Sequence, residues 1–301
     1  MENKIIFSLI IPHKNIPSLL QRCLDSIPIR EDLEIIIVDD NSDSDKIDFE
    51  KFPGKNRKDC IFIFNKKGVG AGAARNLGIE KARGKWLLFA DADDTYTLEL
   101  GEFLDENINN RNDIIYFKSN LVSENSKKEV QINMNIFIDR WLKQKGNIED
   151  IKFGAWEPWN KMVKREYIIK NSIRFDEISS SNDKMFSLRA GEFTVLTDVS
   201  SRILYNYILR PNSIIHSHKK AKFINIFNTT LSQNALYHRI KYNRKVFMPL
   251  IFLSNYKYLT KDIWHKYLGY LKAYKANPFE GLFSFFAFHS LIRLKKKLQK
   301  Y

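Results

Sequence analysis

The sequence predicts an α/β protein with a mostly parallel sheet flanked by helices and a helical extension at the C-terminal end. Two observations support this prediction. In the N-terminal third, continuous apolar runs alternate with helical patterns, as they do when buried parallel strands are joined by helices. Most of these runs also end in polar or glycine-rich residues, which places those residues at one edge of the sheet.

The elements are expected in a definite order. The N-terminal part should contain a strand at 5–11, a helix around 19–24, strands at 34–38 and 61–64, a helix at 73–82 and a strand at 86–90. Further on we expect a strand at 114–117 and helices near 136–144, 223–242 and 261–274. We therefore expect one domain over 1–215, in two halves that meet near 113, followed by a helical, basic and aromatic region over 216–301.

The composition is that of an ordinary globular protein, because 44% of the residues are hydrophobic and 28% are charged. Two cysteines, Cys23 and Cys60, give neither a disulfide framework nor a metal-ligand spacing, so we expect reduced core thiols in a cytoplasmic protein. The sequence has no run near the roughly 20 apolar residues that a membrane span requires.

A net charge of +14 predicts an anionic partner. The partner would be a nucleic acid, a phosphorylated substrate or an anionic membrane surface. The basic run at 293–300 directly follows an aromatic stretch at 283–288, which is typical of an anchor on anionic lipid. A terminal helix packed on its own domain remains an equal alternative. Nucleic acid is disfavoured, because the sequence contains no recognised binding module.

Three carboxylates, Asp91, Asp93 and Asp94, follow the strand at 86–90. Clustered like charges near a buried sheet require a cation. Side chains two apart on an extended segment share one face, so Asp91 and Asp93 can converge on one ion. Oxygen ligands favour Mg²⁺ or Mn²⁺, which also recruit phosphate oxygens. A loop of solvated aspartates is the alternative.

The glycine-rich turn before the helix at 73–82 matches a dinucleotide-binding fingerprint through Gly68, Gly70 and Ala73. Two features count against a nicotinamide or flavin site. The turn follows the third strand rather than the first, and the acid that would contact the ribose, Asp91, is accompanied by two further aspartates. A dinucleotide-dependent enzyme is therefore the minor alternative. Backbone N–H groups beside Arg75 would equally suit a diphosphate.

Taken together, the ordered motifs resemble those of family 2 glycosyltransferases, which are GT-A-fold enzymes. They are Ser8 to Asn15, Val38 to Ser42, Gly72 to Gly78, Ala82 to Gly84 and Asp91 to Asp94, then Pro158 to Lys161, Arg174 to Glu177 and Asn182-Asp183. Each motif is weak by itself, but the ordered set over about residues 5–100, with a second block beyond it, is highly specific.

The resemblance implies a nucleotide-binding half over about 1–113 and an acceptor-binding half over about 114–215. The residues implied at the nucleotide are Pro12, His13, Asn15, Asp40, Gly72, Arg75, Asp91, Ala92 and Asp93. Among them, Asp40 would accept a hydrogen bond from the base, typically uracil. Asp93 would ligate Mn²⁺ or Mg²⁺ directly, with Asp91 at the ribose or a metal-bound water, and His216 is a further candidate ligand.

Asp183 takes the place of the family's catalytic base. The family usually has a glutamate before this aspartate, whereas this chain has Asn182. Four other residues keep two interpretations each. Asp94 supports the metal site or caps the next helix, Trp156 and Trp159 stack on sugars or belong to the core, and Lys161 faces the acceptor or pairs with a carboxylate.

The implied activity is inverting, metal-dependent transfer of a hexosyl or N-acetylhexosaminyl group. The donor would be a nucleoside diphosphate sugar, expected to be a UDP-sugar, and the acceptor a hydroxyl of a glycan or lipid-linked molecule in surface polysaccharide biosynthesis. We expect a cytoplasmic protein that associates peripherally with the inner membrane face through 216–301 and has no nucleic acid partner. A non-catalytic carbohydrate-binding relative, suggested by Asn182, remains the second alternative.

Overall fold

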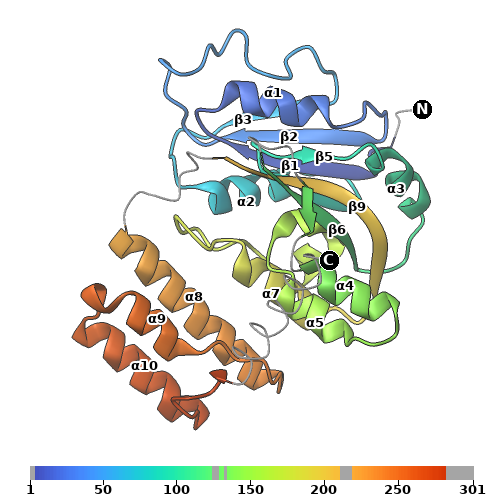
Figure 1. The fold of residues 1–301 in the computed structure, drawn as a ribbon. Helices are drawn as coiled ribbons and strands as arrows, with labels where there is room; N and C mark the ends of the chain where they lie inside the picture. The colour runs from blue at the N-terminus through green and yellow to red at the C-terminus, as the bar shows by residue number, and fades with distance from the viewer. Residues whose placement is uncertain (1–3, 124–128, 132–133, 211–218, 283–301) are drawn as a thin grey trace. The chain divides into compact units, whose positions relative to one another are not determined.

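The computed structural model describes residues 4–123, 129–131, 134–210 and 219–282. Contacts divide the chain into two units, Met1–Ile215 and His216–Tyr301. The first unit contains a sheet with helices on both faces, and the described part of the second unit is helical (Figure 1).

The described residues of the first unit form one nine-stranded sheet. Its strands are β1 (Phe7–His13), β2 (Leu33–Asp39), β3 (Cys60–Phe64), β4 (Trp86–Phe89), β5 (Thr95–Tyr96), β6 (Ile114–Ser123), β7 (Glu129–Gln131), β8 (Lys161–Lys164) and β9 (Thr197–Leu209). The order is β3-β2-β1-β4-β8-β6-β9-β5, with β7 beside β6. Strands β1 to β4 are mutually parallel, as predicted, and β6 is parallel to β9. Strands β5, β7 and β8 run antiparallel to their neighbours.

The helices of this unit are α1 (Pro17–Asp25), α2 (Ala71–Lys81), α3 (Leu100–Asn107), α4 (Met134–Leu142), α5 (Ile148–Gly154), α6 (Arg165–Lys170) and α7 (Lys184–Phe193), with a 3₁₀ turn η1 (Pro158–Asn160). Helices α1, α2 and α4 confirm the predictions for those regions. Helices α3, α5, α6 and α7, together with strands β5, β7, β8 and β9, were not predicted.

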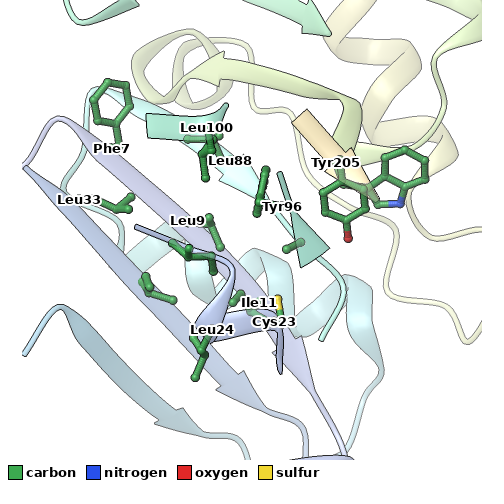
Figure 2. Packing of buried hydrophobic residues seen from close by; sticks show 14 of the residues in the cluster. Phe7, Leu9, Ile11, Cys23, Leu24, Leu33, Leu88, Tyr96, Leu100 and Tyr205 are labelled. Atoms are coloured by element: carbon green, nitrogen blue, oxygen red, sulfur yellow. The ribbon is translucent and has the colours of Figure 1, made fainter. Parts of the chain in front are cut away.

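Alternate residues of the central strands point to opposite faces of the sheet, and each face is covered by its own helix. On one face, Leu9 and Ile11 of β1 pack with Cys23 and Leu24 of α1, as Figure 2 shows. On the other face, Ile10 belongs to the core that includes residues of α2. Burial on both sides explains why β1 and β2 are continuously apolar.

Ser8 and Gly84, which belong to the motifs at 8–15 and 82–84, contribute to the fold. The buried Glu34 of β2 accepts hydrogen bonds from the Ser8 hydroxyl at 2.6 Å and from the backbone N–H of Arg83 at 2.7 Å. Gly84 N–H in turn donates to the Ser8 hydroxyl oxygen at 2.8 Å. These bonds fix the turn from α2 into β4, and a Cβ at Gly84 would meet the backbone of β1 at 2.7 Å.

The second unit has its own core. Its helices are α8 (Lys219–Arg239), α9 (Met248–Ser254) and α10 (Lys261–Tyr274), with a 3₁₀ turn η3 (Tyr256–Tyr258). Aromatic side chains fill the space between these helices, among them Phe227 of α8, Phe252 of α9 and Tyr267 of α10. Within the residues described, none of the helices has the length and apolarity to span a bilayer.

The contact between α2 and β1 leaves no room for a side chain at Gly78. A Cβ there would overlap the Ile10 side chain, so we expect Gly78→Ala to lower the free energy of unfolding by about 1–3 kcal/mol. Gly101 of α3 is a matched control, because a Cβ at this helical position has no neighbour within 4 Å. Gly101→Ala should instead stabilise by about 0.5–1 kcal/mol. Urea unfolding measures both, and equal effects would contradict this packing.

Candidate active site

The carboxyl ends of β1, β2 and β4 meet at one edge of the sheet. Ala90 N–H donates to Ile10 C=O at 3.1 Å, and Asp40 N–H donates to His13 C=O at 2.8 Å. The structure therefore brings Pro12, Asp40 and the aspartates after β4 to the same rim, where α/β sheets bind their ligands.

His13 is buried and fully engaged with its own chain. Its Nδ1 lies 2.8 Å from Asp39 Oδ2, and its Nε2 accepts a hydrogen bond from Ile16 N–H at 3.2 Å. Because Nε2 accepts, Nδ1 carries the proton and donates to Asp39. Asp39 also accepts from the Ser42 hydroxyl at 2.5 Å. His13 thus anchors the ends of β1 and β2 together.

Asn15 joins the two loops that follow these strands. Its backbone lies in the left-handed region with φ 60°, a conformation that asparagine tolerates. Its N–H donates to Ser42 Oγ at 2.8 Å, and its side-chain amide exchanges hydrogen bonds with Asp43 at 2.8 and 2.9 Å. The loop around Pro12 is thereby held in one position.

Asp40 organises the glycine-rich turn. Its carboxylate accepts hydrogen bonds from the N–H groups of Gly70 at 2.7 Å and Val69 at 3.1 Å, and from the Asn65 amide at 3.0 Å. The two backbone N–H groups that would bind a diphosphate in a dinucleotide site therefore point at Asp40 instead. A carboxylate has about four acceptor positions, so these three bonds leave one unused on Asp40, which is buried.

Arg75 of α2 links two distant parts of the chain. One terminal nitrogen of its guanidinium is ion-paired with Asp91, and the other donates to Asn182 Oδ1 at 3.0 Å. The guanidinium carbon also lies 5.3 Å from the centre of the Phe175 ring. The arginine is buried, whereas the Asp91 side chain is 31% exposed. The first aspartate of the rim thus shares one cation with the residue before Asp183.

Helix α2 and the segment at 175–183 are in close contact on both sides of Arg75. A Cβ at Gly72 would overlap the backbone oxygen of Asp176, so only glycine fits there. The Asn76 amide donates to Phe175 C=O at 3.0 Å and accepts from Phe175 N–H at 2.9 Å. These contacts explain the spacing of the motif at 72–78, because three of its residues position the segment that carries Asp183.

Asp93 is ion-paired with Arg210 at the end of β9. Its backbone C=O also accepts a hydrogen bond from Arg22 at 2.7 Å. Burial and the nearby charge of Asp91 raise the pKa of Asp93 above its ordinary value. Neither arginine was assigned a role from the sequence. Arg22 lies in the predicted first helix but contacts Asp93 far along the chain, and the stretch from Arg210 resembles the family's C-terminal loop over the nucleotide, but its pairing with Asp93 was not foreseen.

The Asp94 carboxylate binds β9 and does not cap the next helix. Its Oδ2 accepts from the Tyr205 hydroxyl at 2.8 Å, and its Oδ1 accepts from Ile208 N–H at 2.7 Å. Burial, with the charges of Asp91 and Asp93, raises the pKa of Asp94 to about 8. The helix-cap interpretation is wrong, because α3 begins at Leu100, after Glu99. Asp94 instead holds β9 against the aspartate cluster.

The two candidate sugar-stacking tryptophans have different environments. Trp159 is 6% exposed and stacks on Tyr205 and Tyr207 of β9 with ring centres 4.8 and 5.8 Å apart, so it belongs to the core. Trp156 is only partly buried, and Lys184 Nζ lies 4.4 Å from its ring centre. Trp156 therefore remains the candidate that a sugar can reach.

Asp183 stands immediately before α7 and is partly exposed. Lys161 was expected to face the acceptor or pair with a carboxylate. Its burial contradicts the first expectation, and the carboxylates of Glu157 and Asp183 act on it through their charge, while its hydrogen bonds go to other groups. It is fully buried, and its Nζ donates to the backbone oxygens of Ala155, at 3.0 Å, and Glu157, and to Ser187 Oγ at 3.1 Å. Burial lowers the pKa of Lys161 to about 7.

The remaining candidates are placed as follows. Pro12 is partly buried at the end of β1, and Ala92 is buried between Asp91 and Asp93. His216 lies outside the described residues, as does the stretch at 283–301. Within the ranges that the structure describes, no group of three or more His, Cys, Asp and Glu side chains is arranged to hold a metal ion. Asp91 and Asp93 would therefore need ligands from a substrate.

The chain is similar in sequence to proteins described as glycosyltransferases. EpsJ of Bacillus subtilis, described as an uncharacterised glycosyltransferase, is 26% identical over 218 residues, which is 69% of this chain and 62% of EpsJ. A Mycobacterium tuberculosis PGL/p-HBAD biosynthesis glycosyltransferase is 36% identical over 92 residues, covering 30% of this chain and 36% of that protein. The chain thus spans less than two thirds of the length of either relative.

Solved structures share the fold. The Staphylococcus aureus TarS 1–349 structure in complex with UDP-GlcNAc has a TM-score of 0.61 at 18% identity and covers 90% of this chain and 80% of TarS 1–349. The complex with UDP has a TM-score of 0.57 at 19% identity, covering 77% and 65%. The first unit therefore has the GT-A fold. The sequence model of "Glycosyl transferase family 2" matches residues 8–170, more than half of the 301 residues, and the chain belongs to this family.

Proposed function

We propose that this chain is an inverting glycosyltransferase that moves a hexosyl or N-acetylhexosaminyl group from a UDP-sugar to a hydroxyl of a glycan or lipid-linked acceptor in surface polysaccharide biosynthesis. Family membership supports glycosyl transfer, and the TarS complexes with UDP and UDP-GlcNAc suggest the donor class.

One observation carries the proposal. The Arg75 guanidinium contacts both Asp91, at the rim where a nucleotide would bind, and Asn182, directly before Asp183. A transferase must hold its donor next to the general base that activates the acceptor hydroxyl, since misplacement by about 1 Å can cost a hundredfold in rate. Arg75 provides this link within one planar side chain.

The donor would lie along the rim that β1, β2 and β4 form. The unused acceptor position of Asp40 would accept a hydrogen bond from an N–H of the nucleobase. Pro12 and Ala92 would line the site. His13 and Asn15 would act by fixing the surrounding loops, because their polar atoms are bound to Asp39, Ser42 and Asp43. The exposed oxygens of Asp91 would face the ribose or the diphosphate.

The rim is suited to a divalent cation. Asp91 and Asp93 offer only oxygen ligands, and the Asp91 side chain is 31% exposed at the rim. Mg²⁺ and Mn²⁺ accept one or two carboxylates and take the remaining ligands from phosphates and water. Such an ion would be held by Asp93, with Asp91 beside it, and would supply positive charge to the leaving diphosphate.

Asp183 would act as the general base. Removal of the proton from the acceptor hydroxyl makes the oxygen a competent nucleophile as it attacks the anomeric carbon. The C–O bond to the diphosphate breaks on the opposite side, so the configuration inverts. Asn182 does not argue for a non-catalytic relative, because its amide oxygen accepts the hydrogen bond from Arg75 and Asp183 keeps its carboxylate.

The role of Asp183 can be tested by replacing it with asparagine. Asp183→Asn should lower the rate of sugar transfer about 10²–10⁴-fold, since the general base is lost, and leave UDP-sugar binding unchanged. Transfer is followed by UDP release with a panel of UDP-sugars, and binding by thermal shift. The exposed loop variant Asp45→Asn is the control and should behave as the unmodified protein. Full activity of Asp183→Asn would exclude this residue as the base.

The metal can be tested without an activity assay. We expect UDP to bind about tenfold more weakly in EDTA than in Mn²⁺, a difference of about 1.4 kcal/mol, measured by titration calorimetry. Asp93→Asn should remove most of this difference, whereas Asp45→Asn should preserve it. Equal UDP affinity with and without divalent ions would contradict a metal at Asp93.

A further inference from the structure

The net positive charge of this chain comes from its C-terminal region. Residues 216–301 contain 17 Lys and Arg and only two acidic residues, whereas residues 1–215 contain 32 basic and 33 acidic residues. The anionic partner implied by the net charge of +14 therefore belongs to the helical unit rather than to the nucleotide site.

The helical unit also exposes apolar side chains that its own core does not use. Five of them are between 39% and 72% exposed: Leu250, Leu253, Tyr256, Trp264 and Leu268. We call this set the α9–α10 face. Large exposed apolar side chains gathered on two adjacent helices mark an interaction site more often than isolated ones do.

The members of the α9–α10 face lie on helices α9 and α10, which pack against each other, and on the turn η3 between them. Leu250 and Leu253 lie three residues apart on α9, and Trp264 and Leu268 lie four residues apart on α10, so each pair shares one side of its helix. The Phe252 ring joins the two helices, with its centre 5.0 Å from that of Trp264. The opposite side of α10 is buried in the core through Ile263, Tyr267 and Tyr270.

Lysines border this apolar surface. Lys261, Lys272 and Lys275 are exposed and lie three or four residues from Trp264 or Leu268, or from each other, along the same side of α10. Lys257 Nζ lies 5.8 Å from the centre of the Tyr256 ring. Long lysine stems can cover apolar surface while their charges reach outward, which is the arrangement of interfacial helices.

We propose that the α9–α10 face docks on an anionic lipid bilayer. The leucines and aromatic side chains would enter the boundary between headgroups and acyl chains, and the lysines would contact anionic headgroups. A nucleic acid would use the lysines but leave Leu253 and Leu268 in water. A second copy of the chain, docked through the same face, would bring its lysines against like charges. The segment at 293–300 is itself basic and would be repelled.

This proposal is independent of the chemistry at the nucleotide site, because binding to vesicles requires no turnover. The full chain is sedimented with vesicles of phosphatidylcholine alone or with about 30% phosphatidylglycerol, at low and high salt. We expect binding only to the anionic vesicles and weaker binding as the salt concentration rises. Equal binding to both vesicle types, or to neither, would overturn the proposal.

Paired variants test the face itself. Leu253→Ser with Leu268→Ser should weaken binding to anionic vesicles at least ~10-fold, because two leucines that would enter the bilayer are lost. The matched control is Ile29→Ser with Val195→Ser, two residues that are 80% and 88% exposed in the first unit, and it should bind normally. Lys261→Glu with Lys272→Glu should also weaken binding, whereas Lys51→Glu with Lys58→Glu should do so much less.

Three further results would overturn the assignment. The first is an equal loss in the control pairs, which would indicate nonspecific adsorption. The second is tighter salt-dependent binding to RNA or DNA than to the vesicles, with the leucine pair unaffected. The third is a change in molecular mass of the leucine pair in light scattering with vesicle binding unchanged, which would assign the face to a second copy of the chain.

Discussion

Three aspartates within four residues at the rim of a buried sheet impose the constraint on which the site depends. Their charges repel one another and are poorly solvated, so the fold must bring cations and hydrogen-bond donors to them. Arg75 comes from α2 and pairs with Asp91, Arg210 directly follows β9 and pairs with Asp93, and Tyr205 donates to Asp94. The groups that compensate the charges of these aspartates therefore include some that lie more than 100 residues away in the sequence.

The same compensation couples the rim to the acceptor side. Arg75 has a second terminal nitrogen, and it is used to bind Asn182. Gly72, about one turn before Arg75, and Asn76, directly after it, hold the segment at 175–183 against the helix. A motif that appears in the sequence as a glycine-rich helix start is thus a positioning device for Asp183.

The sequence predicts the first part of the fold well, because β1, β2 and β4 are buried on both faces and read as apolar runs. It fails for β9, which is 13 residues long, mostly half-exposed and rich in polar side chains. Missing β9 meant missing Arg210 and Tyr205. The resemblance suggested candidate site residues, but it did not reveal that Asp40 binds the glycine turn or that His13 binds Asp39, since these are contacts between distant segments.

The central claim is that Arg75 joins the rim to Asn182, the residue before the proposed base Asp183. A double-mutant cycle with Arg75→Ala and Asn182→Ala, measured on kcat/KM for transfer from the preferred UDP-sugar, tests it most directly. Direct contact predicts a coupling energy of about 0.5–3 kcal/mol between the two sites. Additive losses, with coupling no larger than about 0.3 kcal/mol, would show that the two residues act separately and would contradict the account.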